Sequence, residues 1–318
     1  MRNFFVTGGS GFLGSNLVLS LLKGGNKVSV FDNLSRGNAR RLSKISKEIN
    51  FFNGDVKNYD DLLSKSSGHD FFIHMAAING TEFFYSKPQE VLDVSIRGIL
   101  NAIEVCKKNN IKNFIFASSS EVYQNPYLFP TPENVELKIP DIFNPRYSYG
   151  GGKLISELIC SYYYKDFFEK LIIFRPHNVY GPDMGWEHVI PQLILSIKKT
   201  KKLNKTFIEI KGDGNQTRSF IFINDFIEAL NKVIFKGEHR NIYHIGNNDE
   251  ISILELTKMI LKSMNTDLEI RTSQQPKGET DRRCPDDSKI KKLGYKKEYE
   301  LRDGLKSVIK WYLENDQK

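Results

Sequence analysis

The chain has 318 residues, of which 40% are hydrophobic and 26% charged, a composition that argues against a disordered or membrane-embedded protein. The formal net charge is +8, but the basic residues are spread out and form no aromatic–basic motif, so we expect an anionic small molecule and no nucleic acid as partner. Three cysteines without metal-ligand spacing favour free thiols in a reducing cytoplasm and no metal site, and we expect neither a membrane span nor a signal peptide.

The first predicted elements are a strand, a glycine turn and a helix. The apolar run at residues 4–6 predicts a buried parallel strand, and apolar residues at helical spacing follow over 13–22. Gly8, Gly11 and Gly14 occupy the turn and the helix start. Such glycines let the backbone approach a pyrophosphate, to which the helix N-terminus offers N–H groups and a positive dipole end. This unit predicts a dinucleotide-binding site.

The second predicted strand, residues 27–31, ends at an acid. Asp32 lies at the distance, about twenty residues on, where a carboxylate binds the adenosine ribose hydroxyls. A carboxylate there would repel a 2′-phosphate, so Asp32 favours NAD over NADP. Arg36 follows four residues later and could accept that phosphate, so the sequence leaves the preference open.

Strand-like and helical patterns alternate along the rest of the first half. Further strands are predicted at 49–53, 70–74, 113–118 and 171–175, with helices that include 91–109 and 149–168. This alternation predicts an α/β fold with a doubly wound parallel sheet. We assign residues 1–175, with about 219–247 returning, to a dinucleotide-binding domain. Residues 176–218 and 248–318 are assigned to a smaller mixed α/β lobe that binds substrate, with a mostly helical tail from 253 to 311.

The segments after the fifth predicted strand carry the candidate chemistry. Tyr149 and Lys153 are four residues apart on a predicted helix and share one face. A nearby ammonium favours the phenolate, so we expect Lys153 to lower the pKa of Tyr149 toward the range of a general base. Residues 150–152 are all glycine, at a cost to the helix of about 1 kcal/mol each relative to alanine. We therefore expect substrate or a partner helix to approach the backbone there.

The motif Thr-Gly-Gly-Ser-Gly-Phe-Leu-Gly at residues 7–14, the Tyr149–Lys153 pair and the segment 118–123 resemble the extended branch of the short-chain dehydrogenase/reductase family. The resemblance covers nearly the whole chain and is nearest to NAD-dependent nucleotide-sugar epimerases and dehydratases. It implies a Rossmann-type fold, NAD as cofactor and a nucleotide-diphosphate sugar as substrate. The residues it implies for NAD binding are Thr7, Gly8, Ser10, Gly11, Phe12, Leu13, Gly14, Asp32, Asn33, Asp55, Val56, Met75, Ala76, Ala77, Ser118, Tyr149 and Lys153.

The resemblance also implies a catalytic set and a substrate site. Ser119 would hydrogen-bond the sugar hydroxyl, Tyr149 would take its proton, and Lys153 would hold the nicotinamide ribose. Segments 175–182, 216–220 and 281–289 resemble the substrate-binding segments of the family. Arginine suits diphosphate because its planar fork bonds two oxygens at once. The implied substrate contacts are Ser120, Asn178, Arg218 and either Arg282 or Arg283, whereas Trp186, Glu187 and His188 are interpreted equally well as sugar-specificity residues or as loop packing.

Glu121 points to chemistry beyond hydride transfer. Ser119, Ser120 and Glu121 are similar to the corresponding residues of GDP-mannose 4,6-dehydratases and equally to those of UDP-glucuronate decarboxylases. We predict an NAD-dependent nucleotide-sugar 4,6-dehydratase, a lyase, with a GDP-sugar such as GDP-N-acetylglucosamine as candidate donor. In that reaction C4 is oxidised, Glu121 removes the C5 proton, water leaves from C6 and hydride returns.

Three alternatives stay open at this point. The first is UDP-glucuronate decarboxylation, for which Arg146 is the candidate anchor of the substrate carboxylate. The second is C4 epimerisation with Glu121 merely structural, although simple C4 epimerases usually lack this Glu. A dTDP-glucose dehydratase is less expected, because those enzymes carry an Asp at the position of Ser120. The third is an idle, NAD-sensing or RNA-associated relative, which would have no use for the complete Ser119, Tyr149 and Lys153 set.

The resemblance finally implies a homodimer. In the extended branch, two helices of each subunit pair into a four-helix bundle, which here would be residues 91–108 and 149–167. The apolar stripe of the second helix is wide enough to permit this, and it consists of Ile155, Leu158, Ile159, Tyr162 and Tyr163.

Overall fold

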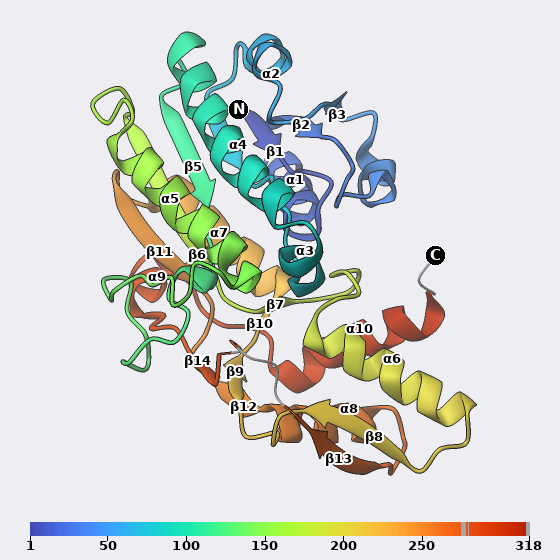
Figure 1. The fold of residues 1–318 in the computed structure, drawn as a ribbon. Helices are drawn as coiled ribbons and strands as arrows, with labels where there is room; N and C mark the ends of the chain where they lie inside the picture. The colour runs from blue at the N-terminus through green and yellow to red at the C-terminus, as the bar shows by residue number, and fades with distance from the viewer. Residues whose placement is uncertain (275–277, 279, 316–318) are drawn as a thin grey trace.

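The computed structural model describes residues 1–274, 278 and 280–315, and its largest part is a seven-stranded sheet (Figure 1). The strand order is β11-β6-β5-β4-β1-β2-β3, with every neighbouring pair parallel. This confirms the predicted doubly wound parallel sheet. The strands are β1 (Asn3–Thr7), β2 (Lys27–Asp32), β3 (Ile49–Asn53), β4 (Phe71–His74), β5 (Asn113–Ala117), β6 (Lys170–Pro176) and β11 (Asn241–Ile245).

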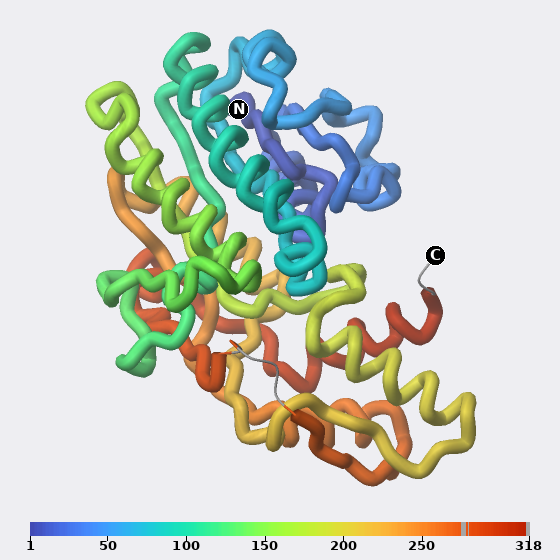
Figure 2. Tube along the Cα trace, in the orientation of Figure 1, coloured from blue at the N-terminus to red at the C-terminus, as the bar shows by residue number. Residues whose placement is uncertain are grey.

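Alternate side chains of β1 enter two separate cores, because successive residues of a strand point to opposite faces of the sheet. Phe4 and Val6 pack into the core beneath α1 (Phe12–Lys23) and α7 (Ile223–Lys236). Phe5 packs into the core on the other face, beneath α2 (Tyr59–Ser66), α4 (Pro88–Lys108) and α5 (Ser148–Tyr162). Helices α4 and α5 lie side by side, as the tube in Figure 2 shows.

The order of the strands reverses direction beside β1. From β1 the chain proceeds to β2 and β3 on one side and then to β4, β5 and β6 on the other. In open parallel sheets a ligand crevice forms at such a switch point, outside the carboxyl ends of the strands. The predicted glycine turn follows β1 and therefore lies at this point.

A smaller lobe lies beyond the carboxyl ends of the strands, in the lower part of Figure 1. Its helices are α6 (Val189–Lys202), α8 (Ile253–Ser263) and α10 (Leu301–Glu314), whereas the short α9 (Ser288–Lys292) packs against β11 and α7 of the large sheet. Its strands form three small sheets that pair β7 (Val179–Tyr180) with β10 (Ile221–Phe222), β8 (Phe207–Lys211) with β13 (Glu269–Ser273), and β9 (Thr217–Ser219) with β12 (Glu250–Ser252) and β14 (Arg282–Arg283).

Two sequence predictions need correction. The tail is less helical than expected, because β13 pairs with β8 and β14 with β9. These partners lie more than 50 residues earlier in the chain, so the pairing leaves no local signal in the sequence of the tail. The second predicted helix, 149–168, ends at Tyr162, after which Tyr163 is extended. Because the helix ends there, the chain turns back and Phe168 packs in the core, with 5.7 Å between the centroids of the Phe168 and Phe114 rings.

Candidate active site

The turn between β1 and α1 is sterically reserved for glycine. Gly8 has a φ of +72°, and a Cβ there would come within 2.8 Å of the Ala76 Cα. A Cβ on Gly14 would stand 2.2 Å from the Gly8 carbonyl oxygen. Gly11, the N-cap of α1, supplies no side-chain acceptor to the first helical turn, whose N–H groups therefore suit a phosphate.

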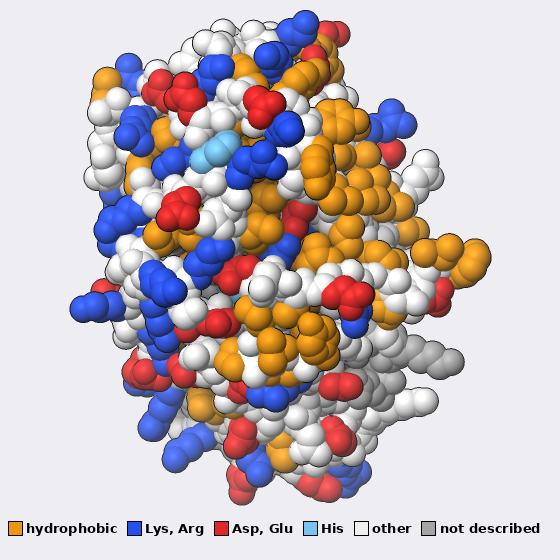
Figure 3. Space-filling model, turned by 90° about the vertical axis from the view of Figure 1, so that its left-hand side faces the viewer, with side chains coloured by type: hydrophobic (Ala, Val, Ile, Leu, Met, Phe, Trp, Pro, Cys, Tyr) orange, Lys and Arg blue, Asp and Glu red, His pale blue; other side chains and the backbone are white. Residues whose placement is uncertain are grey.

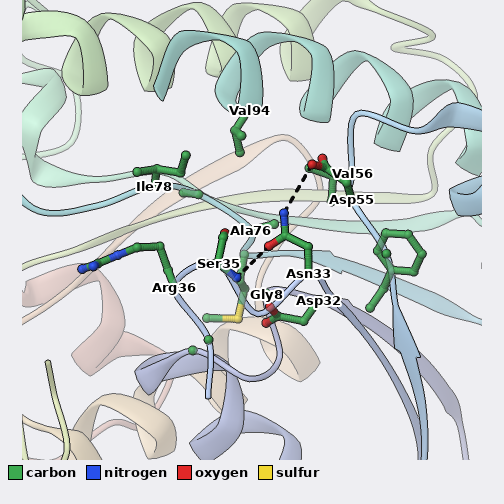
Figure 4. A pocket seen from close by; sticks show the side chains of 16 residues that line it. Gly8, Asp32, Asn33, Ser35, Arg36, Asp55, Val56, Ala76, Ile78 and Val94 are labelled. Atoms are coloured by element: carbon green, nitrogen blue, oxygen red, sulfur yellow. Dashed lines mark hydrogen bonds between the residues drawn. The ribbon is translucent and has the colours of Figure 1, made fainter. Parts of the chain in front are cut away.

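A cavity of about 90 Å³ adjoins this turn and gathers many of the predicted cofactor residues (Figure 4). Asp32 accepts hydrogen bonds from the backbone N–H groups of Ser10 and Leu34, each at 2.8 Å, and burial raises the pKa of its carboxyl. Each of its oxygens keeps a lone pair for a ribose hydroxyl, so the geometry fits the adenosine half of NAD. The predicted residues that line this cavity are Gly8, Gly11, Asp32, Asn33, Asp55, Val56, Met75, Ala76 and Ala77.

A second, larger cleft of about 320 Å³ continues from the first along the carboxyl ends of the strands. It brings together both predicted sets, since its lining contains Phe12, Leu13, Gly14, Ser118, Ser119, Ser120, Glu121, Tyr149, Lys153, Asn178 and Arg283. The dinucleotide turn and the candidate catalytic residues therefore share one continuous space.

Four residues predicted to bind NAD or substrate line neither cavity, and one of them, Arg282, pairs with Glu250 at 2.6 Å. Thr7 is buried and its hydroxyl lies 2.9 Å from Nδ1 of His74, while Ser10 contributes its backbone N–H to Asp32. Arg218 donates to the carbonyl oxygens of Thr280 at 2.6 Å and of Asp281 at 3.2 Å, and so holds the segment that leads to β14. A diphosphate contact of Arg218 stays a prediction.

Tyr149 and Lys153 lie on one face of α5, but their electrostatics differ from the expectation. Tyr149 is stacked on Phe84 of α3 (Thr81–Ser86), with 5.0 Å between ring centroids. Burial raises the pKa of Tyr149; a hydrogen bond from Ser119 opposes this rise, and the charge of Glu121 adds to it. The Lys153 ammonium donates to the Ala117 carbonyl at 2.6 Å, and burial lowers its pKa to about 8. The predicted lowering of the Tyr149 pKa by lysine is therefore wrong for this structure, in which desolvation of the buried phenol is the largest influence and raises the pKa.

Glu121 is held between two arginines. It lies in the short 3₁₀ turn Ser120–Val122, and its carboxylate is 2.9 Å from Nη1 of Arg283 and 3.3 Å from Nη2 of Arg146. Burial alone would raise the pKa of Glu121, but the two guanidinium groups lower it to about 2, so the carboxylate is ionised. Sequence reasoning placed neither arginine on Glu121, because the contacts span 25 and 162 residues of chain.

Two of the three glycines of α5 are places of close approach. A Cβ on Gly150 would stand 2.7 Å from the Glu121 carbonyl oxygen, and one on Gly152 would stand 2.8 Å from the Ser95 side chain of α4. The expected helix partner is thus α4 of the same chain, and the second neighbour is the loop that carries Glu121. Gly151 meets only the side chain of Ile139, at 3.3 Å.

A buried ion pair that sequence reasoning missed anchors the catalytic helix. Glu157 of α5 accepts two hydrogen bonds from Arg175 of β6, at 2.8 and 2.5 Å, and a third from the hydroxyl of Ser118. Arg175 continues to the hydroxyl of Tyr123, which lies 2.6 Å from Nε2 of His244. The available signal was an acid four residues after Lys153 on a helical face that is otherwise apolar.

In the loop between β7 and α6, Trp186, Glu187 and His188 lie in three different environments. Trp186 packs on Tyr312 at 5.0 Å between ring centroids, Glu187 pairs with Arg36, and His188 lines the larger cleft. Only His188 therefore faces the space available to a sugar nucleotide.

Comparison with known proteins agrees with this geometry. The sequence model of the NAD dependent epimerase/dehydratase family matches residues 4–246. The chain belongs to this family. Its cofactor is NAD, and the glycine turn and Asp32 described above fit that dinucleotide. Within the described ranges, no helix combines the length and apolarity needed to cross a bilayer.

The similar proteins differ in the reactions that their names state. A dTDP-D-glucose 4,6-dehydratase of Dictyostelium discoideum is 31% identical over 82% of this chain, which spans 62% of that longer protein. A putative UDP-glucose 4-epimerase of Methanocaldococcus jannaschii is also 31% identical, over 98% of this chain and 99% of that protein. Among solved structures, the dTDP-glucose 4,6-dehydratase of Streptomyces venezuelae with NAD bound is 26% identical, with a TM-score of 0.88 over 98% of this chain and 97% of that one. The protein is therefore an enzyme of the nucleotide-sugar dehydratase and epimerase family.

Proposed function

We propose that the protein is a nucleotide-sugar 4,6-dehydratase. The observation that carries this proposal is an ionised carboxylate, Glu121, in the same cleft as Tyr149 and Lys153. A C4 epimerase needs only the proton and hydride exchange at C4. A carboxylate beside that centre supplies the base that a second step, at C5, requires.

In the first step the residues of this chain position and deprotonate the sugar. Ser119 and Tyr149 hold the C4 hydroxyl, and Tyr149 takes its proton. The glycine turn and Asp32 would hold NAD, which when bound would supply the hydride acceptor for C4 and the hydride donor for C6. The positive charge of an oxidised nicotinamide would also favour the Tyr149 phenolate, which burial disfavours in the free protein.

In the second step Glu121 removes the C5 proton, which the C4 ketone acidifies. This proton leaves with the C6 hydroxide as water. Hydride addition at C6 then requires a proton at C5, and the proton that Tyr149 took from the C4 hydroxyl balances it. A carboxylate with a pKa of about 2 is a weak base while two arginines hold it. If the substrate diphosphate recruits Arg283, one of these contacts is lost and the pKa of Glu121 rises toward a useful range.

UDP-glucuronate decarboxylation is the second candidate, favoured by one feature of Arg146. Its Nε and Nη1 are buried and have no hydrogen-bond partner among the described residues. Buried guanidinium donors without acceptors are costly, and a sugar carboxylate would supply an acceptor to one of these two diverging N–H groups.

A panel of GDP-, UDP-, CDP- and dTDP-sugars, incubated with the NAD-loaded protein and weighed by mass spectrometry, tests the proposal. A GDP-sugar such as GDP-N-acetylglucosamine is the first donor to assay, because Ser120 replaces the acid of dTDP-glucose dehydratases. We expect one donor to lose water. Loss of CO₂ from UDP-glucuronate would establish the second candidate, and a new isomer of unchanged mass would establish an epimerase.

The variants Glu121→Gln and Tyr149→Phe separate the two steps. We expect Tyr149→Phe to abolish all turnover, and Glu121→Gln to keep reduction of bound NAD by the donor but lose dehydration. Full dehydration by Glu121→Gln would refute the assigned base.

We also propose that two copies pair through α4 and α5. Figure 3 views the side of the molecule on which α5 lies, and hydrophobic side chains gather there into a band. Leu158 and Tyr162 of α5 are 53% and 69% exposed, unusual for large hydrophobic residues on a helix that is otherwise packed. Sedimentation velocity of wild type and Leu158→Glu tests this assembly: a lasting dimer in the variant would contradict it.

A further inference from the structure

An ion pair connects a loop that borders the cofactor cavity with a loop that borders the larger cleft. Arg36 belongs to the loop after β2, and Glu187 to the loop between β7 and α6, 151 residues later. The two side chains face each other as a fork, with Nη1–Oε1 and Nη2–Oε2 distances of 3.3 Å each. On its other side the guanidinium lies 4.1 Å from the centroid of the Phe83 ring. Arg36 is thus held between a carboxylate and an aromatic face.

The position of Arg36 bears on the cofactor. Arg36 lines the same cavity as Asp32, where the adenosine ribose would bind. Figure 4 shows its side chain directed away from Asp32 and Asn33. A 2′-phosphate on that ribose would lie beside the Asp32 carboxylate and would need a free guanidinium to offset the repulsion. Arg36 is four residues from Asp32 and has the length to turn back, but Glu187 holds its two terminal nitrogens.

We propose that Glu187 is a specificity-determining residue that makes the enzyme reject NADP by withholding Arg36 from the adenosine ribose. Asp32 then repels the 2′-phosphate. Arg36 is the cation of the loop after β2 that lines the cavity, and its pairing with Glu187 keeps it from offsetting this repulsion. The contact also explains why an arginine at this position is compatible with an NAD enzyme. The inference concerns the cofactor alone and holds whichever sugar reaction the enzyme performs.

The variant Glu187→Gln tests this by leaving the shape of the loop while removing the charge. The measured quantity is the dissociation constant of NADPH relative to that of NADH, each determined by isothermal titration calorimetry on the full chain freed of bound nucleotide. One regained hydrogen bond between charged groups contributes about 1.5 kcal/mol, so we expect relative NADPH affinity to rise about tenfold. An unchanged ratio in a folded Glu187→Gln protein would overturn the proposal.

Asp183→Asn provides a matched control. Asp183 pairs with Arg40 at 2.6 Å and Arg41 at 2.9 Å, so it joins the same two loops without touching Arg36. We expect its NADPH-to-NADH ratio to equal that of wild type. A similar gain in Asp183→Asn would mean that loosened loops, and not a released Arg36, admit the phosphate.

Two further variants identify the cation. Arg36→Met combined with Glu187→Gln should lose the whole gain, and a gain that persists in this double variant would contradict the role of Arg36. Arg36→Met alone should change the ratio less than about twofold, because Glu187 already withholds the charge. A selective loss of NADPH binding in that single variant would show that Arg36 reaches the phosphate in the wild type, against the proposal, even if Glu187→Gln failed to fold.

Discussion

Neighbouring glycines of α5 should respond in opposite ways to the same added methyl group. Gly151→Ala and Gly152→Ala lie in one turn of the catalytic helix, and each alanine is favoured over glycine in a helix interior by about 1 kcal/mol. The difference between them comes from the tertiary neighbours. The new Cβ at 151 would meet Cδ1 of Ile139 at 3.3 Å, the far end of a flexible side chain. The new Cβ at 152 would stand 2.8 Å from both Cβ and Oγ of Ser95.

The expected free energies of unfolding follow from these contacts. Gly151→Ala should stabilise the protein by up to about 1 kcal/mol, because Ile139 can shift at little cost. Gly152→Ala should destabilise it by up to about 2 kcal/mol, because overpacking a rigid helix contact costs about 1–3 kcal/mol and the propensity gain offsets only part of that. The free energies of unfolding of the two variants should therefore lie on opposite sides of the wild-type value and differ from each other by about 2 kcal/mol.

Urea unfolding at saturating NAD measures this difference while the contribution of bound cofactor is kept constant. The double variant Ser95→Gly with Gly152→Ala removes the Ser95 Cβ, so it should recover stability and give a coupling energy of about 1 kcal/mol or more in the double-mutant cycle. The reasoning is refuted if Gly152→Ala is as stable as Gly151→Ala, or if the cycle shows no coupling with Ser95.

Two further predictions concern buried charge on the same helix. Burial lowers the pKa of Lys153 from 10.5 to about 8, so between these pH values the unfolded chain binds more protons and this lysine makes the free energy of unfolding rise with pH. Urea midpoints of wild type and Lys153→Met at pH 7 and pH 10 measure this effect. The stability difference should shift in favour of wild type as pH rises, and a constant difference would contradict the pKa shift. Glu157→Gln leaves the Arg175 guanidinium buried without its counterion, so it should lower the free energy of unfolding by about 3–5 kcal/mol in thermal or urea unfolding. The control Asp93→Asn breaks the exposed pair with Arg97 and should cost less than about 1 kcal/mol. Equal losses would show that burial of the pair is not decisive.

The sequence by itself determined the features that depend on local spacing. The glycines after β1 and the Tyr149–Lys153 separation predict a dinucleotide turn and a shared helix face, because a strand and a helix have fixed periods. The ribose contact of the acid at the end of β2 stays a prediction. The alternation of apolar strands and amphipathic helices likewise predicted the parallel sheet. Each of these inferences requires only residues that are close in the chain.

Only the tertiary structure decided the electrostatics of the site and the pairing of the small lobe. The pKa of Tyr149 rises instead of falling because desolvation depends on everything packed around the phenol, which no four-residue spacing reveals. The arginines on Glu121 and the contact of Glu187 with Arg36 join residues distant in the chain, as do the pairings of β13 and β14. Charge and burial act through space, so the folded chain had to bring these groups together before their effects could be read.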